Sequence, residues 1–504
     1  MISLFQKGEV LMNKKNRDRI ALFLGPALFI ASQLLDRPAH MSQEAYSVFG
    51  ATLWIAAWWI FEAVPIAVTA LLPIVLFPMT GALDIASTTT AFGHKYIFLY
   101  MGGFILAIAI EKWGLHKRVA LHIINLIGTN IQKIILGFMV ATGFLSMWIS
   151  NTATSVMMLP IGMAIVSQFK RNEGQGGNQG EKFGKALMLA IAYSASIGGL
   201  ATLIGTPPNL VLAGILEELY HVKLTFFQWL KFGLPASVML ILICWRYLTK
   251  YSFKFDNNQF PGGTVEIKRM LTDLGKISYE EKSVLIVFAF TAMAWIFRSL
   301  LQKVMPGLDD SIIAIIAGIV LFTLPAKSQK RKLITWEEAV KLPWGIILLF
   351  GGGMALAKGF TSTGLAEWIA MQMAQLQGLK MIVLMLILVA MVNFLTEITS
   401  NLATTAMLLP VLAPMAFAFD LHPFMIMASV TLAASCAFML PVATPPNAVV
   451  FGSGYLRIRD MVRSGVVMNI ISIILITVFT YFLLPYLWEF DPTSFPKAFK
   501  AFLD

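Results

Sequence analysis

The sequence is poor in charge and in cysteine. Asp, Glu, Lys and Arg make up 13% of its 504 residues, and it has two cysteines and six histidines. Soluble domains carry about 25% charged residues. The histidines form no cluster with metal-ligand spacing, and Cys244 and Cys436 both lie in apolar segments. These shortages argue against a soluble domain, a disulfide and a metal–thiolate site, and they favour the cysteines as small core residues.

Apolar residues are what the chain has in excess. They make up 58% of it, against about 45–50% in soluble domains. Many runs approach the roughly 20 residues that cross a bilayer as a helix. Only helices and closed barrels satisfy their backbone in lipid, and these runs lack the alternation of barrel strands. We therefore predict an all-α polytopic protein of the cell membrane that contacts lipid. One of its predicted spans covers 66–79.

The net charge of +11 reflects short basic loops and not a nucleic-acid surface. Such loops mark the cytoplasmic side of a membrane protein. The first span, near 19–35, lacks a signal-peptide cleavage site, so it is expected to stay in the protein with a cytoplasmic N-terminus. The basic residues are Lys14, Lys15, Arg17 and Arg19, and then Lys327, Lys330, Arg331 and Lys332.

A polar motif stands inside an uncharged apolar block. SNTATSVMMLP occupies Ser150–Pro160, and 136–169 contains no Asp, Glu, Lys, Arg or His. The block 133–169 is too long for one helix. SNLATTAMLLP returns at Ser400–Pro410, 250 positions later, within the similar block 379–419.

Two more motifs recur in the same order. FLYMGGFILAIAIEKWGL from Phe98 aligns with LLFGGGMALAKGFTSTGL from Leu348, again 250 positions apart. GTPPN at Gly205 has its counterpart in ATPPN at Ala443. Three ordered pairs indicate an internal duplication. In carriers, such repeats enclose the binding site, and the count of spans between the copies predicts inverted halves.

The Thr-Pro-Pro motifs predict broken helices. Proline lacks the backbone donor and disfavours helical geometry at the preceding residue, so the predicted spans near 186–204 and 424–440 end at a break. Broken backbone at membrane depth must be buried in protein or line a wet cavity. Its carbonyls suit sodium, and helix N-termini attract anions. We therefore interpret each Ser-Asn motif as the tip of a re-entrant hairpin. Two such tips could bind a small dianion without Lys or Arg.

Other interpretations of the polar residues stay open. Ser and Thr also serve as packing contacts between membrane helices. Glu397, the one charge between Met381 and Phe419, could be a proton site or a structural carboxylate at a hairpin turn. Glu62 and Glu111 lie near predicted span ends, where an interfacial position is expected.

The motif set resembles the divalent anion:sodium symporter family, and especially its bacterial sodium-dependent dicarboxylate transporters. The resemblance rests on WWIFEAVPIAVTALLPIVLFP (Trp58–Pro78), both Ser-Asn motifs and both Thr-Pro-Pro motifs. It implies a homodimer with about 11 transmembrane helices, inverted repeats with two re-entrant hairpins and broken helices, and an elevator mechanism. On this basis the chain divides into first-repeat scaffold helices (1–132), a first-repeat transport region (133–225), a linker with second-repeat scaffold helices (226–378) and a second-repeat transport region (379–504).

The resemblance also assigns site residues by position. One sodium ion would bind Ser146, Ser150, Asn151 and Gly205, and a second Thr396, Thr399, Asn401 and Ala443. The substrate would contact Ser150, Asn151, Thr152, Thr206, Ser400, Asn401 and Thr444. The second motif has Leu402 where the family often has Thr, which removes one hydroxyl.

The predicted function is secondary transport of C4–C5 dicarboxylates such as succinate, fumarate, malate or 2-oxoglutarate. Sodium is the expected coupling ion, and no organic cofactor, nucleic acid or enzymatic reaction is expected. Exchange of one dicarboxylate for another is the main alternative within transport. A membrane enzyme lacks an acid–base pair or metal cluster in this sequence, and a channel would not need paired hairpins.

Overall fold

The computed structural model describes residues 14–128, 130–173, 179–255, 263–373 and 380–500, most of which are helical. Within these ranges, β-structure is limited to one antiparallel pair, β1 (Pro325–Ala326) and β2 (Arg331–Lys332). Six of the described helices are long and apolar enough to cross a membrane, and six shorter ones are also apolar. The prediction of an all-α, multi-pass membrane protein is confirmed.

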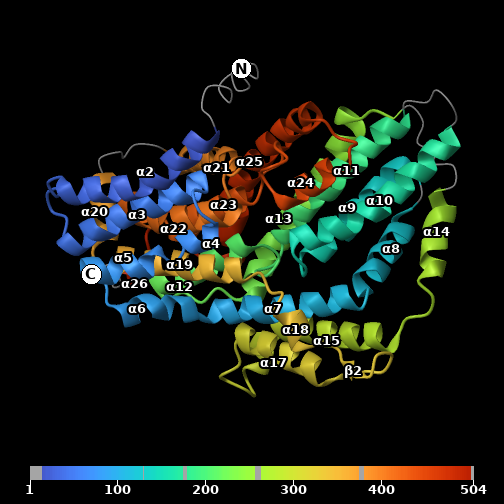
Figure 1. Cartoon of the computed structure of the whole chain (residues 1–504), viewed down its shortest axis with the longest axis horizontal. Coiled ribbons are helices and arrows are strands. Elements are labelled where there is room, and N and C mark those ends of the chain that lie inside the picture. Colours follow the sequence, from blue (N-terminus) through green and yellow to red (C-terminus); the bar gives the residue numbers. More distant parts are fainter. Residues whose placement is uncertain (1–13, 129, 174–178, 256–262, 374–379, 501–504) are drawn as a thin grey trace.

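The N-terminal helices form a group on one side of the molecule (Figure 1). Trp58 of α3 donates to the Leu22 carbonyl of α2 at 3.0 Å. The predicted span 66–79 corresponds to the apolar helical stretch Ile66–Thr80. A turn at residues 70 and 71 divides it, and Pro73 lies in the first turn of the second piece, where proline is tolerated. The group comprises α2 (Lys14–Leu34), α3 (Gln43–Phe61), α4 (Ile66–Thr69), α5 (Leu72–Thr80), α6 (Ile85–Thr90) and the 3-10 turn η1 (Ala91–Gly93).

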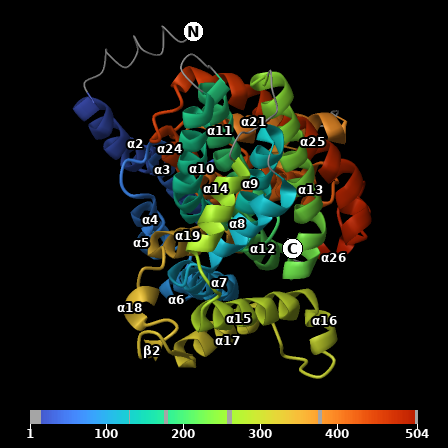
Figure 2. The same cartoon turned by 90° about the vertical axis from the view of Figure 1, so that its right-hand side faces the viewer.

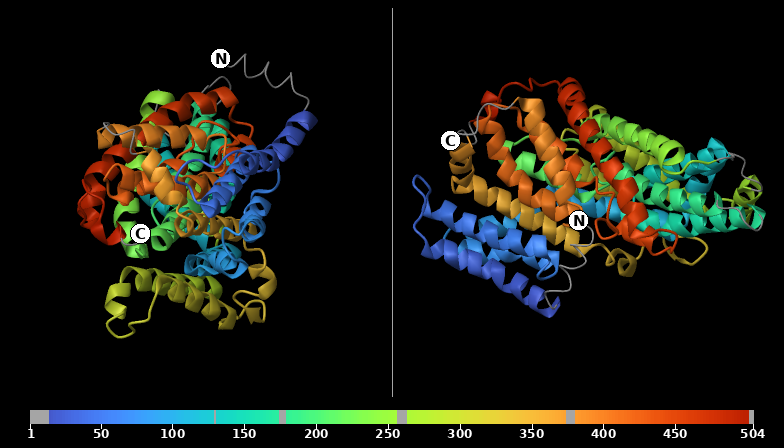
Figure 3. Two further views of the ribbon diagram at one scale, coloured as in Figure 1. Left: turned by 90° about the vertical axis from the view of Figure 1, so that its left-hand side faces the viewer. Right: turned by 90° about the horizontal axis from the view of Figure 1, so that it is seen from above.

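Two series of seven helices follow the same order, as the sequence repeat predicts. The first is α7 (Lys95–Lys112), α8 (Leu115–Ile127), α9 (Ile131–Ser146), α10 (Asn151–Glu173), α11 (Gln179–Gly199), α12 (Pro207–Tyr220) and α13 (Phe226–Tyr247). The second is α19 (Trp344–Ser362), α20 (Leu365–Met373), α21 (Met381–Leu395), α22 (Asn401–Ala418), α23 (Pro423–Ala434), α24 (Pro445–Phe451) and α25 (Ile458–Trp488). The pair α9–α10 lies in one half of the molecule and α21–α22 in the other (Figures 1 and 3).

A connecting region joins the two series. It begins after α13, and two of its helices, α15 and α17, form a layer beside α7 (Figure 2). Arg118 of α8 binds the Glu281 carboxylate through Nε and Nη2, at 2.9 and 3.1 Å. The region comprises the π-helical turn η2 (Leu248–Ser252), α14 (Gly263–Asp273), α15 (Tyr279–Ile296), α16 (Arg298–Leu301), α17 (Asp310–Thr323) and α18 (Trp336–Ala339); α26 (Lys497–Lys500) follows α25.

Small residues bring each repeat's elements into close contact. A side chain at Gly198 of α11 would collide with the backbone of Gly143 of α9. In the second repeat, a side chain at Gly465 of α25 would collide with the backbone of Phe438 and Met439. Glycine allows such backbone contacts between membrane helices. These contacts hold α9 against α11, and α25 against the chain that follows α23. Cys244 and Cys436 are buried and free, as expected of core residues.

Candidate binding site

The two long apolar blocks are helical hairpins. The first turns between Ser146, where α9 ends, and Asn151, where α10 begins; the second turns between Leu395 and Asn401. At the first tip the Ser150 hydroxyl caps α10 by accepting from the Ala153 N–H at 3.2 Å. The Ser-Asn motifs therefore lie at helix N-termini, as predicted, and their free backbone N–H groups point beyond the helix.

The two Thr-Pro-Pro motifs start new helices after a break, as predicted. Pro207 begins α12 and Pro445 begins α24. The preceding residues, Thr206 and Thr444, have nearly the same extended backbone, with φ of −142° and −141°. Matching geometry at corresponding positions shows that the duplication extends to the shape of the break.

The breaks begin earlier than the predicted spans allow. The helices end at Gly199 and Ala434, so the expected spans 186–204 and 424–440 are each too long by several residues. The asparagines of the two Thr-Pro-Pro-Asn motifs help to explain why these helices end early. Asn209 Nδ2 donates to the carbonyls of Gly199, Leu200 and Thr202 at 3.1, 3.4 and 2.7 Å. Carbonyls freed from a helix need such partners when they are buried.

The second asparagine repeats the arrangement. Asn447 Nδ2 donates to the carbonyls of Ala437 and Leu440 at 3.3 and 3.0 Å. Sequence reasoning assigned no role to either asparagine, although the residue occurs after Thr-Pro-Pro in both copies. That repetition was the available signal.

The hairpin tips and the breaks meet at one cavity of about 920 Å³. The structure brings together all twelve residues that the sequence predicted for the site. Ser146 and Thr396 are fully buried behind the tips. The other ten line the cavity: Ser150, Asn151, Thr152, Gly205, Thr206, Thr399, Ser400, Asn401, Ala443 and Thr444.

Oxygen atoms crowd the space behind the first tip. The Ser146 hydroxyl donates to the Ala195 carbonyl at 2.7 Å, and its oxygen lies 2.5 Å from the Asn151 amide oxygen. One hydroxyl proton cannot satisfy both acceptors. If the amide were turned, its nitrogen would lie 2.5, 3.1 and 3.3 Å from Ser146 Oγ, Ala195 O and Gly205 O. The centre of this group is therefore suited to a donor or to a cation.

The second tip has the same arrangement. The Thr396 hydroxyl lies 2.8 Å from the Ala434 carbonyl and 2.7 Å from the Asn401 amide oxygen. Ala195 and Ala434 occupy the last turns of α11 and α23. Carbonyls at the ends of broken helices are typical sodium ligands in carriers. Sequence reasoning missed both carbonyls because a backbone ligand needs no particular side chain.

Glu397 holds the second break in place. Its carboxylate accepts from the N–H groups of Phe438 and Met439 at 2.8 and 2.9 Å, and from Leu440 at 3.0 Å. Asn469 of α25 donates to it at 2.8 Å. Four donors satisfy the buried carboxylate. Of the two roles that the sequence left open, these contacts favour the structural one.

The cavity offers an anion neutral donors and apolar surface. Leu402 lines it at the position where the first tip has Thr152, and Tyr100 and Phe104 form another part of the wall. Of the described residues that line the cavity, Glu62 alone is charged. Sequence reasoning expected Glu62 at the membrane interface and missed this position.

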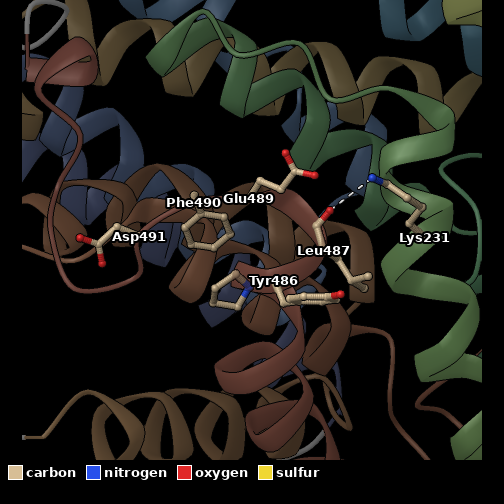
Figure 4. A pocket seen from close by; sticks show the side chains of 7 residues that line it. Lys231, Tyr486, Leu487, Glu489, Phe490 and Asp491 are labelled. Carbon is tan, nitrogen blue, oxygen red and sulfur yellow. Dashed lines mark hydrogen bonds between the residues drawn. The ribbon is translucent and has the colours of Figure 1, made fainter.

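A second hollow, of about 560 Å³, lies between α13 and the end of α25 (Figure 4). It contains the lysine that the first cavity lacks. Lys231 Nζ, however, already donates to the Leu487 carbonyl at 3.3 Å, and Glu489 and Asp491 line the same hollow. None of the predicted site residues lines it, so the hairpin cavity is the better candidate for a dianion.

The chain is similar to known proteins over most of its length. Residues 17–488 match the family described as the sodium:sulfate symporter transmembrane region. The sodium-dependent dicarboxylate transporter SdcS of Staphylococcus saprophyticus is 45% identical over 484 residues, which cover 94% of this chain and 93% of that protein. SdcS of Staphylococcus aureus strain bovine RF122 / ET3-1 is 47% identical over 479 residues, covering 94% and 92%.

A solved structure shares the fold. The crystal structure of the YdaH transporter of Alcanivorax borkumensis matches with a TM-score of 0.57 and 15% sequence identity. The match covers 83% of this chain and 90% of that one. At this identity the likeness concerns the arrangement of helices alone.

Proposed function

The chain belongs to the sodium:sulfate symporter family, and from this premise we propose that it carries C4–C5 dicarboxylates across the membrane with sodium as the coupling ion. It is a transporter and not an enzyme. Succinate, fumarate, malate and 2-oxoglutarate are the proposed substrates. The names of the similar staphylococcal proteins, sodium-dependent dicarboxylate transporters, support this class.

One observation carries the proposal: two equivalent Ser-Asn tips face one cavity, and each is backed by a group of neutral oxygens. At the first tip these are Ser146, Asn151 and the Ala195 carbonyl. At the second they are Thr396, Asn401 and the Ala434 carbonyl. Several neutral oxygens that converge on one point can bind a monovalent cation, and backbone carbonyls at broken helices are typical members of such sets.

Each tip asparagine links an ion to the substrate. In the first proposed sodium site, Ser146, Asn151 and Gly205 bind the ion together with Ser150; in the second, Thr396, Thr399, Asn401 and Ala443 do so. The other face of each asparagine lies on the cavity. Sodium binding would therefore orient the amide that meets the substrate, and this shared ligand couples the two.

The dianion is proposed to lie between the tips. One carboxylate would contact Ser150, Asn151 and Thr152, and the other Ser400, Asn401 and Thr444, with Thr206 nearby. Backbone N–H groups at the starts of α10 and α22 add favourable dipoles. The two bound sodium ions supply the positive charge that the cavity wall lacks.

The mobile part is proposed to comprise the hairpins and broken helices, 133–225 and 379–504. The remaining helices, 1–132 and 226–378, would form the scaffold of a homodimer whose transport regions move in an elevator motion. The basic loops favour a cytoplasmic N-terminus.

Uptake of labelled succinate into proteoliposomes tests the proposal directly. With an inward sodium gradient, uptake should exceed that in potassium or choline medium. Absence of uptake and of exchange under every gradient would contradict the proposed substrate class.

The same vesicles separate symport from exchange. A symporter fills empty liposomes when sodium is supplied outside. An obligatory exchanger fills only liposomes that were preloaded with a dicarboxylate. A conductance far above the turnover of a carrier would instead indicate a channel.

A further inference from the structure

Glu62 is a carboxylate in a cavity proposed to receive a dianion. It follows the last residue of α3 and lines the cavity together with Pro65, Ile66 and Ala67. Its side chain is exposed. Within the described part of the chain the Glu62 carboxylate has no hydrogen bond and no ion pair, so its negative charge is not neutralised by a neighbouring group.

The local backbone does not explain why a glutamate stands here. Glu62 caps the C-terminus of α3 in the left-handed conformation, with φ of 47° and ψ of 42°. Its N–H donates to the Trp58 carbonyl, a contact that any residue except proline could make. Glycine or asparagine adopts this conformation with less strain. The carboxylate therefore needs a reason other than helix capping.

The charge pattern of the cavity supplies that reason. The described lining contains no lysine, arginine or histidine, and Glu62 is its sole charged member. A cleft lined by one sign of charge concentrates ions of the opposite sign and repels ions of its own sign. In this cavity the carboxylate attracts cations and opposes a dicarboxylate.

We propose that Glu62 concentrates sodium in the cavity and keeps the dicarboxylate out until sodium is bound. The proposal rests on the proposed function, because it assumes that sodium and a dicarboxylate share the cavity. Glu62 does not have to be a sodium ligand at the tips. It acts through its field from the cavity wall, which raises the local concentration of sodium and lowers that of the dianion.

The test removes the charge and keeps the shape. Glu62→Gln should raise the sodium concentration for half-maximal succinate uptake by about three- to tenfold, the scale of one partly screened charge interaction. At saturating sodium the KM for succinate should stay equal or fall, because the repulsion is gone. A merely structural defect would lower the maximal rate or raise both constants.

Three controls isolate the charge. Glu44→Gln removes an exposed carboxylate at the other end of α3, away from the cavity, and should behave like the wild type. Glu62→Asp keeps the charge and should restore most of the sodium affinity. Raising the ionic strength with choline chloride should reduce the difference between Glu62→Gln and the wild type. A difference that is independent of ionic strength would overturn the proposal.

A second readout keeps this inference separate from the proposed function. Sodium should raise the unfolding temperature of the purified protein more than potassium does, without any dicarboxylate. Glu62→Gln should shift the midpoint of that sodium titration upward by a similar factor. If the wild type transports succinate but both midpoints are unchanged in Glu62→Gln, the role of Glu62 is wrong and the transport proposal stands. If the wild type transports no dicarboxylate, the proposed function fails, and the sodium titration still decides whether Glu62 attracts the ion.

Discussion

The Thr396 hydroxyl lies 2.7 Å from the Asn401 amide oxygen, across the turn of the second hairpin. Ser146 and Asn151 stand in the same relation in the first hairpin, at 2.5 Å. In both, the hydroxyl also meets a carbonyl at the end of a broken helix. These contacts connect each hairpin tip to the broken helix beside it. They also place the asparagine amide of each tip between the buried oxygen atoms and the cavity.

Asn151→Ala and Asn401→Ala should each abolish most sodium-dependent uptake. Each removes an oxygen from the proposed ion site and donors from the substrate carboxylate. A hydrogen bond to a charged group contributes about 1.5–3 kcal/mol, which corresponds to a roughly tenfold to hundredfold loss of affinity. Uptake at varied sodium and succinate measures the loss. Asn130→Ala, which removes the N-cap of α9, is the matched control and should transport normally. If both tip variants showed normal uptake with unchanged sodium dependence, the site assignment would be wrong, and the Ser-Asn motifs would serve only as packing contacts between helices.

Glu397→Gln should affect stability more than sodium coupling. The glutamine amide would turn an NH₂ group toward backbone N–H groups of 438–440, and at least one buried donor would lose its acceptor. The loss is on the order of 1–3 kcal/mol. Thermal unfolding of the purified protein measures it, with Asn469→Leu as a partner variant that removes one donor to the same carboxylate. A variant of full stability in which succinate uptake no longer depends on pH would favour a proton site instead.

Leu402→Thr should strengthen substrate binding. The change supplies the hydroxyl that the first tip has in Thr152, at a residue that lines the cavity. One added hydrogen bond to a carboxylate should lower the KM for succinate by up to about tenfold. Thr152→Val is the opposite change and should raise the KM. Competition by a panel of C4 to C6 acids would show whether the hydroxyl also alters the preferred length. If the KM were unchanged in both variants, the side chains at positions 152 and 402 would not contact the substrate.

Glu338 of α18 should stabilise the protein at neutral pH, and this stabilisation should be lost in acid. Burial opposes its ionisation, but hydrogen bonds from Arg331 and Lys112 lower the pKa of Glu338 to about 2. Because the pKa is lower in the folded state, the stabilisation is present above the ordinary value of 4.5 and is lost as the pH falls toward about 2. Glu338→Gln should therefore reduce stability at neutral pH by roughly 1–2 kcal/mol after solvent screening. Thermal unfolding from pH 7 to pH 3 should show the difference from the wild type shrinking below about pH 4.

The sequence by itself determined the membrane class, the duplication and the residues at which the helices restart after each break, Pro207 and Pro445. Apolar runs without charge have no stable place in water, and Thr-Pro-Pro cannot continue a helix. The length of the two blocks predicted a turn in each, and the Ser-Asn motifs were the expected place for it. These are local properties, and they can be read from consecutive residues.

Only the tertiary structure decided which groups meet. The Ala195 and Ala434 carbonyls join the oxygen groups behind the tips because packing places α11 and α23 there, and a carbonyl carries no side-chain signal. Glu397 could be assigned to the second break only when residues 438–440 were seen to point their N–H groups at it. Glu62 was expected at the membrane interface, since proximity to a span end is all that its sequence position conveys. Its place in the cavity wall depends on contacts between segments far apart in the chain, and such contacts are set by how the helices pack.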